Sequence, residues 1–472
     1  MKNYPTAERS TPQERLARSR AERQSIDQPD EVIDGGWFWR RLQKKYARRV
    51  QKIASNPREG MLGSNLVLYQ AMAKYVDEEL RAWEELGDDV PVWSPGAALG
   101  YRLGPAMGFH TYPLDSFTDL MTPDEARWSM DYVRRLGFPS DICDRIQNIG
   151  ALMVSGRLPR ISLVTLEFND CSQGAQANLW AAREVGAQIY TFDVPFEQDM
   201  QAVRYVEEQL REMIDLAVKN IPGVKYDRES EARLVQYQEI YRQGMHWQRK
   251  IAKLAARKPC PISGRDALRM PARQLCWQQS FVDYFRESYL ELEKRSAQGE
   301  SPLNGPEKFR VLWTATAPFY SDPFDYLEKR GCAVPAYEEG TGCATYYVPG
   351  EGKQFFGHEL ENPLQEEAAT LLWDHWAGTA ERRIWEVAMR CRQLDIDGIV
   401  HFEQGGCVAC NGSARVMGER IESELGIPSL YIRGWCQDLE KHDEQAFQAQ
   451  LGEWVEISTR QKEAKEQERG QE

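Results

Sequence analysis

Cys407 stands where a predicted strand gives way to a predicted helix. Residues 397–426 begin with β-branched and aromatic residues typical of a buried strand, turn at Gly405 and Gly406, and continue with helical spacing up to Gly426. Cys407 is therefore expected at the carboxyl end of a strand, beside a helix amino terminus. Unpaired backbone N–H groups and the helix dipole favour an anion there, so the thiol is biased towards the metal-binding thiolate.

Cys171 occupies a second corner of the same kind. Residues 161–168 form a β-rich run, "NDCSQG" turns the chain, and residues 175–184 have helical spacing. The alternative for each corner is a buried cysteine of an α/β core, because free cysteine packs as a small hydrophobe. Two matching corners in one chain favour a shared chemical role.

Cys143 is a third candidate thiolate. In "FPSDICDRIQNIG", Ser140 is the expected N-cap, which places Cys143 in the first helical turn. Ile142, Ile146 and Ile149 form the expected buried stripe of this helix, and Cys143 lies off it.

Three cysteines so far apart in the sequence suggest a metal cluster between two domains. A zinc site usually combines paired C-x2-C units, and among the candidates only Cys407 and Cys410 show that spacing. Soft thiolates in a reducing compartment fit an iron–sulfur cluster, with one iron position left for another group. A zinc-stabilised α/β protein is the alternative, and Cys410 competes with Cys407 as third ligand.

Composition indicates a soluble cytoplasmic protein. The chain has 472 residues, 42% of them hydrophobic, and contains no apolar run long enough for a membrane span and no apolar signal core near its start. Its ten cysteines lack the spacing of a disulfide framework. A net charge of −13 argues against nucleic-acid binding. The glycine-rich passage 94–109 lacks the Gly-Lys-Ser/Thr of a Walker loop, which argues against nucleotide hydrolysis.

Alternating strands and helices predict an α/β fold with two doubly wound parallel sheets and helical additions at the N-terminus and in the middle. Strands of the second sheet are expected near 309–315, 333–338, 397–403 and 428–433, with one long helix over 364–394. The expected domains are an N-terminal arm with helices (1–87), a first α/β domain (88–220), a helical insertion (221–305), a second α/β domain (306–458) and a polar tail (459–472). Ligands of such sheets bind beyond the carboxyl ends of the strands, where Cys171 and Cys407 are expected.

A basic helix is predicted from Trp37 to Ser55. Its cations stand out in an acidic chain: Arg40, Arg41, Lys44, Lys45, Arg48, Arg49 and Lys52. The simple interpretation is a solvated helix face. The functional one is a patch for an acidic partner or for the phosphates of a nucleotide-like ligand.

The sequence resembles the family of benzoyl-CoA reductase and 2-hydroxyacyl-CoA dehydratase subunits. The resemblance covers roughly residues 90–457 and is most specific in "DICDRIQNIGALMVSGRLPRISLVTLEFNDC", "AQIYTFDVPF" and "DGIVHFEQGGC…RIESELGIPSLYI". It implies two flavodoxin-like domains and a 4Fe–4S cluster bound by Cys143, Cys171 and Cys407. It also implies a related second subunit in a heterodimer or larger assembly, and a separate ATP-dependent iron–sulfur activator.

The function implied by this resemblance is delivery of single low-potential electrons to an acyl-CoA thioester in anaerobic metabolism. The start "MKNYPT" and the phrase "LREMIDLAVKNIPGVKYD" resemble the larger catalytic subunit of the reductases, which implies an aromatic, benzoyl-CoA-type substrate. A 2-hydroxyacyl-CoA dehydratase subunit and an electron relay without its own substrate site are the alternatives. Most of the other cysteines are expected to pack in cores: Cys260, Cys276, Cys332, Cys343, Cys391 and Cys436. Of these six, Cys343 and Cys436 are the two that are kept as further candidates for the site.

Overall fold

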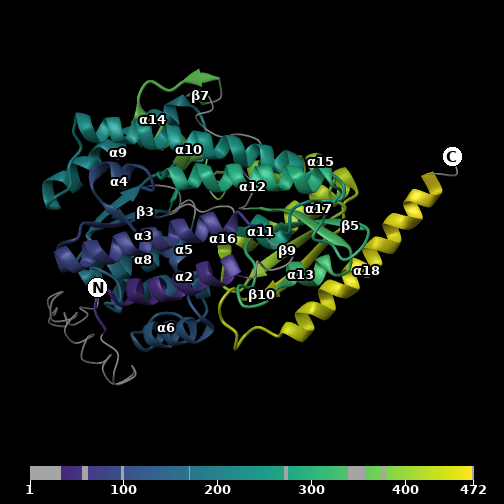
Figure 1. The fold of residues 1–472 in the computed structure, drawn as a ribbon. Helices are drawn as coiled ribbons and strands as arrows, with labels where there is room; N and C mark the ends of the chain where they lie inside the picture. The colour runs from purple at the N-terminus through teal and green to yellow at the C-terminus, as the bar shows by residue number, and fades with distance from the viewer. Residues whose placement is uncertain are drawn as a thin grey trace, which may run out of the picture.

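The computed structural model of the protein describes most of the chain. The described residues are 33–55, 62–96, 100–168, 171–269, 275–338, 354–355, 357–373, 376 and 378–469. Cys343 and the expected N-terminal arm before residue 33 lie outside them. The described residues form two four-stranded sheets surrounded by helices, and the two sheets lie in different halves of the molecule (Figure 1).

The first sheet has the strand order β2-β1-β3-β4, and all its pairs are parallel. Its strands are β1 (Val92–Ser94), β2 (His110–Thr111), β3 (Leu163–Glu167) and β4 (Gln188–Phe192). β3 is buried along its whole length, as expected for a central strand of a parallel sheet that is covered on both faces. Its alignment places Trp93 of β1 opposite Leu163.

The second sheet has the order β10-β9-β5-β6 and is also parallel throughout. Its strands are β5 (Phe309–Thr314), β6 (Cys332–Tyr337), β9 (Gly398–Gln404) and β10 (Ser429–Gly434), close to the predicted ranges. A short antiparallel pair, β7 (Gln354–Phe355) with β8 (His358–Glu359), lies outside both sheets.

Both sheets share one topology. Numbered within its own sheet, each has the order 2-1-3-4, which is the flavodoxin-like order with its switch point between the first and third strands. The predicted fold class, two flavodoxin-like doubly wound parallel sheets, is therefore confirmed. The domain limits given above stay a prediction.

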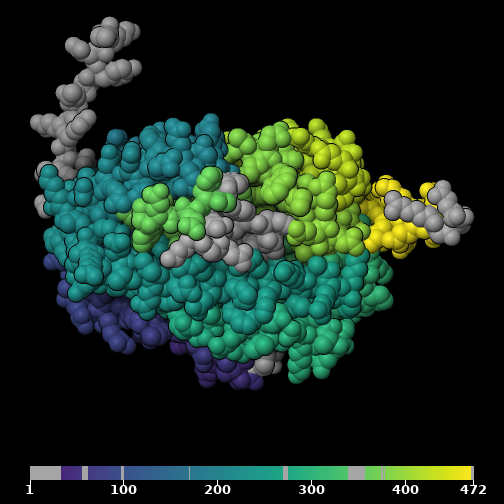
Figure 2. Space-filling model, turned by 90° about the horizontal axis from the view of Figure 1, so that it is seen from above, coloured from purple at the N-terminus to yellow at the C-terminus, as the bar shows by residue number. Residues whose placement is uncertain are grey.

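Helices cover the sheets and join the two halves. They are α2 (Trp37–Ser55), α3 (Asn65–Leu86), η1 (Gly87–Asp89), α4 (Leu103–Met107), α5 (Leu114–Thr118), α6 (Pro123–Arg135), α7 (Asp144–Val154), α8 (Ser172–Val185), α9 (Met200–Asn220), α10 (Arg228–Ala255), α11 (Gly264–Arg269), α12 (Gln279–Ala297), α13 (Pro323–Glu328), α14 (Pro363–Leu372), α15 (Ala380–Gln393), α16 (Val408–Asn411), α17 (Ala414–Leu425) and α18 (Glu444–Arg469). One continuous core of buried residues connects α2, α3 and α12 with strands of both sheets. The view from above shows the teal surface of the middle helices running along both halves, with the yellow end of the chain, α18, emerging at one end (Figure 2).

The long helix predicted over 364–394 is wrong in one respect, because the structure divides it into α14 and α15. Gly378 has a φ of +89°, a left-handed conformation that no helix continues through. Thr379 then caps a new helix, since its hydroxyl accepts a hydrogen bond from the Arg382 N–H. No helix in the part of the chain that the structure describes is both long and apolar enough to cross a membrane.

Candidate functional site

A cavity of about 150 Å³ lies where the carboxyl ends of the two sheets face one another. Gly96 and Glu167 line it from the first sheet, after β1 and at the end of β3. Thr316 and Gln404 line it from the second sheet, after β5 and at the end of β9. The cavity thus touches the switch point of each sheet, and its volume is far above the roughly 10–15 Å³ that one water needs.

Four cysteines line this cavity: Cys143, Cys171, Cys407 and Cys410. Cys171 follows β3 and Cys407 follows β9, so each comes after the third strand of its sheet. The structure therefore brings together the three sequence-predicted ligands and the alternative one. Their role as ligands stays a prediction.

The three predicted ligands occupy the same local position, since each is the N-cap residue of a helix. The Cys171 sulfur accepts a hydrogen bond from the Gly174 N–H at 3.2 Å, and the Cys407 sulfur accepts one from the Cys410 N–H at 3.4 Å. Cys143 makes no capping bond, although the Ile146 N–H still lowers the pKa of its thiol. The sequence pattern predicts the strand-to-helix corners at Cys171 and Cys407, but it does not indicate this common capping position.

The helix start predicted at Ser140 is wrong by several residues. Helix α7 begins at Asp144, which makes Cys143 the N-cap rather than a first-turn residue. The physical reason is a tertiary contact: a side-chain carbon on Gly406 would lie 2.5 Å from the Ile142 carbonyl carbon and 2.7 Å from the Cys143 nitrogen. The turn after β9 therefore packs directly against the backbone just before α7, and no helical pattern in the sequence reports such a neighbour.

Cys410 lies in the cavity rather than in helix packing alone. A single helical turn, α16, follows Cys407 and was not predicted, and it carries Cys410 back towards the cavity. Cys410 is 4% exposed, and the Cys407 thiol interacts by hydrogen bonds with both Cys143 and Cys410. The choice between Cys407 and Cys410 consequently remains open.

The surroundings of Cys143 and Cys407 favour their neutral thiols, because the pKa of each is raised. A hydrogen bond with Cys407, burial and the nearby Asp144 carboxylate raise the pKa of Cys143 well above its ordinary value. For Cys407, the hydrogen bond with Cys143 lowers the pKa, but the bond with Cys410 and burial outweigh it, so the pKa is also well above its ordinary value. The thiolate bias expected from the helix termini is therefore outweighed in the metal-free protein, and a bound metal would have to supply the positive charge.

The residue types that line the cavity bear on which metal group it could hold. Within the described ranges, no group of three or more His, Cys, Asp or Glu side chains is arranged to hold a single metal ion. A cluster of several irons spreads its cysteines wider than one ion does, and four soft thiols around one cavity fit that requirement.

Two residues beside the cysteines were missed by sequence analysis. Asp144 is fully buried, and its carboxylate accepts hydrogen bonds from the backbone N–H groups of Gln437 at 2.6 Å and Asp438 at 2.9 Å. The Gln404 side-chain amide donates to the same carboxylate at 2.6 Å. Burial raises the pKa of Asp144 despite these bonds. The one signal in the sequence was an acidic residue directly after Cys143 at a helix start.

The remaining wall of the cavity combines apolar side chains with charged and polar ones, which include Asp115 and Asn178. Ile146, Ile149 and Leu166 form an apolar part. Arg145 also lines the cavity, and its guanidinium donates to the Asp115 carbonyl at 3.1 Å and forms an ion pair with Asp119.

The other described cysteines are buried away from the cavity lining. Cys260, Cys276, Cys332 and Cys391 lie in hydrophobic cores, as predicted. Cys436 is 1% exposed and donates a hydrogen bond to the Thr316 hydroxyl at 3.0 Å. Because Thr316 lines the cavity, Cys436 lies directly behind the cavity wall and contacts it through Thr316.

Two comparisons with known proteins give matches over most of the chain. The family model of the 2-hydroxyglutaryl-CoA dehydratase D-component matches residues 103–457, a range that includes all four cysteines of the cavity. The alpha subunit of (R)-phenyllactyl-CoA dehydratase from Clostridium sporogenes is 22% identical over 348 residues, which are 71% of this chain and 81% of that protein.

Proposed function

Because the chain belongs to the family of the 2-hydroxyglutaryl-CoA dehydratase D-component, we propose that it is the iron–sulfur subunit of an enzyme that delivers single low-potential electrons to an acyl-CoA thioester. The observation that carries this proposal is the meeting of four cysteines in one cavity at the switch points of two parallel sheets. We further propose that the protein works in the cytoplasm.

Cys143, Cys171 and Cys407 would hold a 4Fe–4S cluster, and the fourth iron position would stay open for substrate. When bound, the cluster would supply one electron at a time at low potential. The chain's own residues have three tasks. They exclude water from the cavity, hold the acyl group against Ile146, Ile149 and Leu166, and place the Arg145 guanidinium where the thioester carbonyl gains negative charge.

An aromatic acyl-CoA of the benzoyl-CoA type is the first candidate substrate, supported by the reductase-like phrases of the sequence. Reduction of its ring consumes two electrons and two protons for each dienoyl-CoA formed. A 2-hydroxyacyl-CoA is the second candidate, supported by the two dehydratase matches. Dehydration releases water and returns the electron, so it consumes no reductant overall.

An electron relay without a substrate site is a third candidate, and the position of Cys410 supports it. A cluster closed by Cys143, Cys171, Cys407 and Cys410 would have no open iron. An enzyme would need a related second subunit and a separate ATP-dependent activator to supply electrons. The relative named above is an alpha subunit, which supports a multi-subunit assembly.

Anaerobic purification tests the cluster. We expect the wild-type chain, produced with its partner subunit, to contain iron and sulfide in equal amounts and to give an electron paramagnetic resonance signal after reduction. Cys407→Ser should lose cluster content, whereas Cys410→Ser should retain it with an altered potential. A cluster retained without Cys407 but lost without Cys410 would reverse the ligand assignment, and a wild-type chain without iron would refute the proposal.

Stoichiometry separates the two reactions. Benzoyl-CoA and a 2-hydroxyacyl-CoA are each incubated with the loaded enzyme and a low-potential reductant. Ring reduction predicts that one dienoyl-CoA forms for two electrons consumed, whereas dehydration predicts many enoyl-CoA products for each electron. Absence of both products, with the cluster in place, would favour the relay.

A further inference from the structure

Gln404 links a cysteine of one half of the molecule to the sheet of the other. It is the last residue of β9 in the second sheet and is 1% exposed. Its Nε2 lies 3.7 Å from the Cys143 sulfur and 2.6 Å from Asp144 Oδ1. Cys143 precedes α7, which packs against α6 and α8 beside the first sheet. The amide group therefore reaches across the junction at the edge of the cavity.

The surroundings fix the direction of this amide. Asp144 Oδ1 also accepts the Arg145 N–H at 2.9 Å, and Asp144 Oδ2 accepts two backbone N–H groups from the segment after β10. The Asp144 side chain is thereby held in place as an acceptor and orients the Gln404 Nε2 towards α7. The Gln404 carbonyl accepts the Asn411 side-chain amide at 2.8 Å and the Cys407 N–H at 3.1 Å, which fixes the backbone from which this side chain projects.

We propose that Gln404 is a positioning residue that donates a hydrogen bond to the Cys143 sulfur and thereby sets the reduction potential of the cluster bound there. This inference rests on the proposed function, because it assumes that Cys143 is a cluster ligand. It goes further, because a residue of the second sheet would control the reduction potential through Cys143, a ligand from the first half of the chain.

The physical reason is the charge of the reduced cluster. Reduction adds negative charge to the cluster and its thiolates, and an N–H donor stabilises that charge more in the reduced state than in the oxidised one. Loss of the donor therefore favours the oxidised cluster and lowers the reduction potential. A hydrogen bond to a charged group is roughly twice as strong as one between neutral groups, so an effect of about tenfold on the reduction equilibrium is expected.

The test compares two substitutions of glutamine by methionine in the complete complex. Gln404→Met keeps the length of the side chain and removes the N–H donor to Cys143. Gln437→Met is the matched control: the Gln437 side chain bonds Asn148 and the Thr118 carbonyl in the same buried junction but makes no bond to a sulfur. Its backbone N–H, which bonds Asp144, remains in the variant.

The readout is a redox titration of the cluster followed by electron paramagnetic resonance, with iron content measured in parallel. We expect Gln404→Met to shift the reduction equilibrium about tenfold towards the oxidised form, which is about 59 mV for a one-electron couple. Gln437→Met should shift it by less than about twofold, even where the two variants lose similar stability. Gln404→Glu provides a second variant should Gln404→Met not assemble, because it keeps the shape, removes the amide donor and adds negative charge, so the potential falls at least as far.

Equal potentials of wild type and Gln404→Met, or equal shifts in Gln404→Met and Gln437→Met, would overturn the inference while leaving the proposed function intact. A wild-type complex without iron would instead refute the proposed function, and the role of Gln404 with it. The two failures are therefore distinguished by the wild-type protein alone.

Discussion

Gly406 allows two halves of the candidate site to touch. Its φ of +72° lies in the left-handed region, which glycine adopts without strain. A side-chain carbon there would lie within 2.7 Å of three backbone atoms of residues 141–143, and backbone atoms in a packed junction have little freedom to move. The position of Cys143 in the cavity therefore depends on a glycine in a distant part of the sequence.

Replacing Gly406 by alanine tests this dependence. We expect Gly406→Ala to separate the turn after β9 from α7 and to reduce iron content severely, since the ligands of the two halves would no longer face one cavity. The matched control is Gly426→Ala, because Gly426 has a similar φ of +69° and no atom within 4 Å of the added carbon. That change should cost only about 1 kcal/mol of unfolding free energy and retain the cluster. Equal iron content in both variants would contradict the argument.

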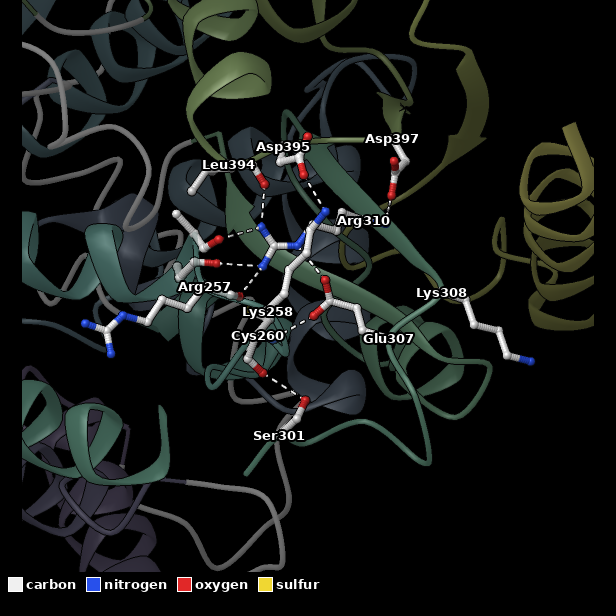
Figure 3. Close-up of polar contacts among 12 residues, drawn as sticks. Arg257, Lys258, Cys260, Ser301, Glu307, Lys308, Arg310, Leu394, Asp395 and Asp397 are labelled. Carbon is white, nitrogen blue, oxygen red and sulfur yellow. Dashed lines mark hydrogen bonds and ion pairs between the residues drawn. The ribbon is translucent and has the colours of Figure 1, made fainter. Parts of the chain in front are cut away.

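At the scale of elements, Arg310 joins two helix ends to the second sheet. Its side chain on β5 is fully buried. Its guanidinium donates hydrogen bonds to two helix ends (Figure 3). The acceptors are the carbonyls of Ala255, Ala256 and Arg257 at the end of α10 and the Leu394 carbonyl after α15. Glu307 accepts from its Nε at 2.7 Å and balances the charge. A cation at two helix carboxyl ends is stabilised by both dipoles, so this residue fixes the middle helices to the sheet.

We expect Arg310→Met to destabilise the chain by about 3–5 kcal/mol, because it leaves buried carbonyls and the Glu307 carboxylate without their partner. Chemical denaturation monitored by circular dichroism measures this loss. Lys258→Met provides the control: its exposed ion pair with Asp395 lies in the same region (Figure 3), and its removal should cost less than about 1 kcal/mol. Similar losses for the two variants would show that the buried guanidinium does not hold the junction.

At the scale of the whole molecule, the basic helix α2 has two different faces. Arg41 forms an ion pair with Glu125, and Lys45 donates to the Leu120 carbonyl, so these two cations hold α2 against the body. Burial, followed by the neighbouring charges of Arg41 and Arg49, lowers the pKa of Lys45 to about 7. The outer face retains four exposed cations: Lys44, Arg48, Arg49 and Lys52. The solvated face expected for all the cations of α2 is therefore observed for only some of them.

Reversing charge on this outer face tests whether it serves an acidic partner. Exchange of the neighbouring Arg48 and Arg49 for Glu would also remove the 2.6 Å bond from Arg49 to the Tyr69 hydroxyl, so the pair Arg48→Glu and Lys52→Glu is the better choice. We expect this pair to weaken subunit assembly or acyl-CoA binding about tenfold at low salt and less at high salt, because screening shortens the reach of exposed charges. Sedimentation and ligand titration measure the two associations.

The control for this experiment changes the same amount of charge elsewhere. Lys219 on α9 and Lys253 on α10 are exposed, and their joint exchange for Glu alters the net charge equally. An effect shared by both pairs would be due to net charge alone. No effect of the α2 pair on either association would leave the solvated-face interpretation.

Local sequence pattern determined many of the elements of this protein and two of its three expected cluster positions. Periodicity predicted α2 with its observed ends and the strands β3, β5, β9 and β10 closely, because buried strands and amphipathic helices depend on residues that are neighbours in the chain. The corners at Cys171 and Cys407 followed from the same pattern. Equivalent positions in two sheets of equal topology then meet in one cavity.

Tertiary structure alone decided the details on which the chemistry depends. The helix after Cys143 begins late because the turn at Gly406 packs against residues 141–143, and Cys410 enters the cavity because of one extra helical turn. The bond from Gln404 to Cys143 joins residues that are 261 positions apart. Periodicity reports only neighbours within a turn or a strand, whereas these contacts arise from the docking of two sheets that the chain forms separately.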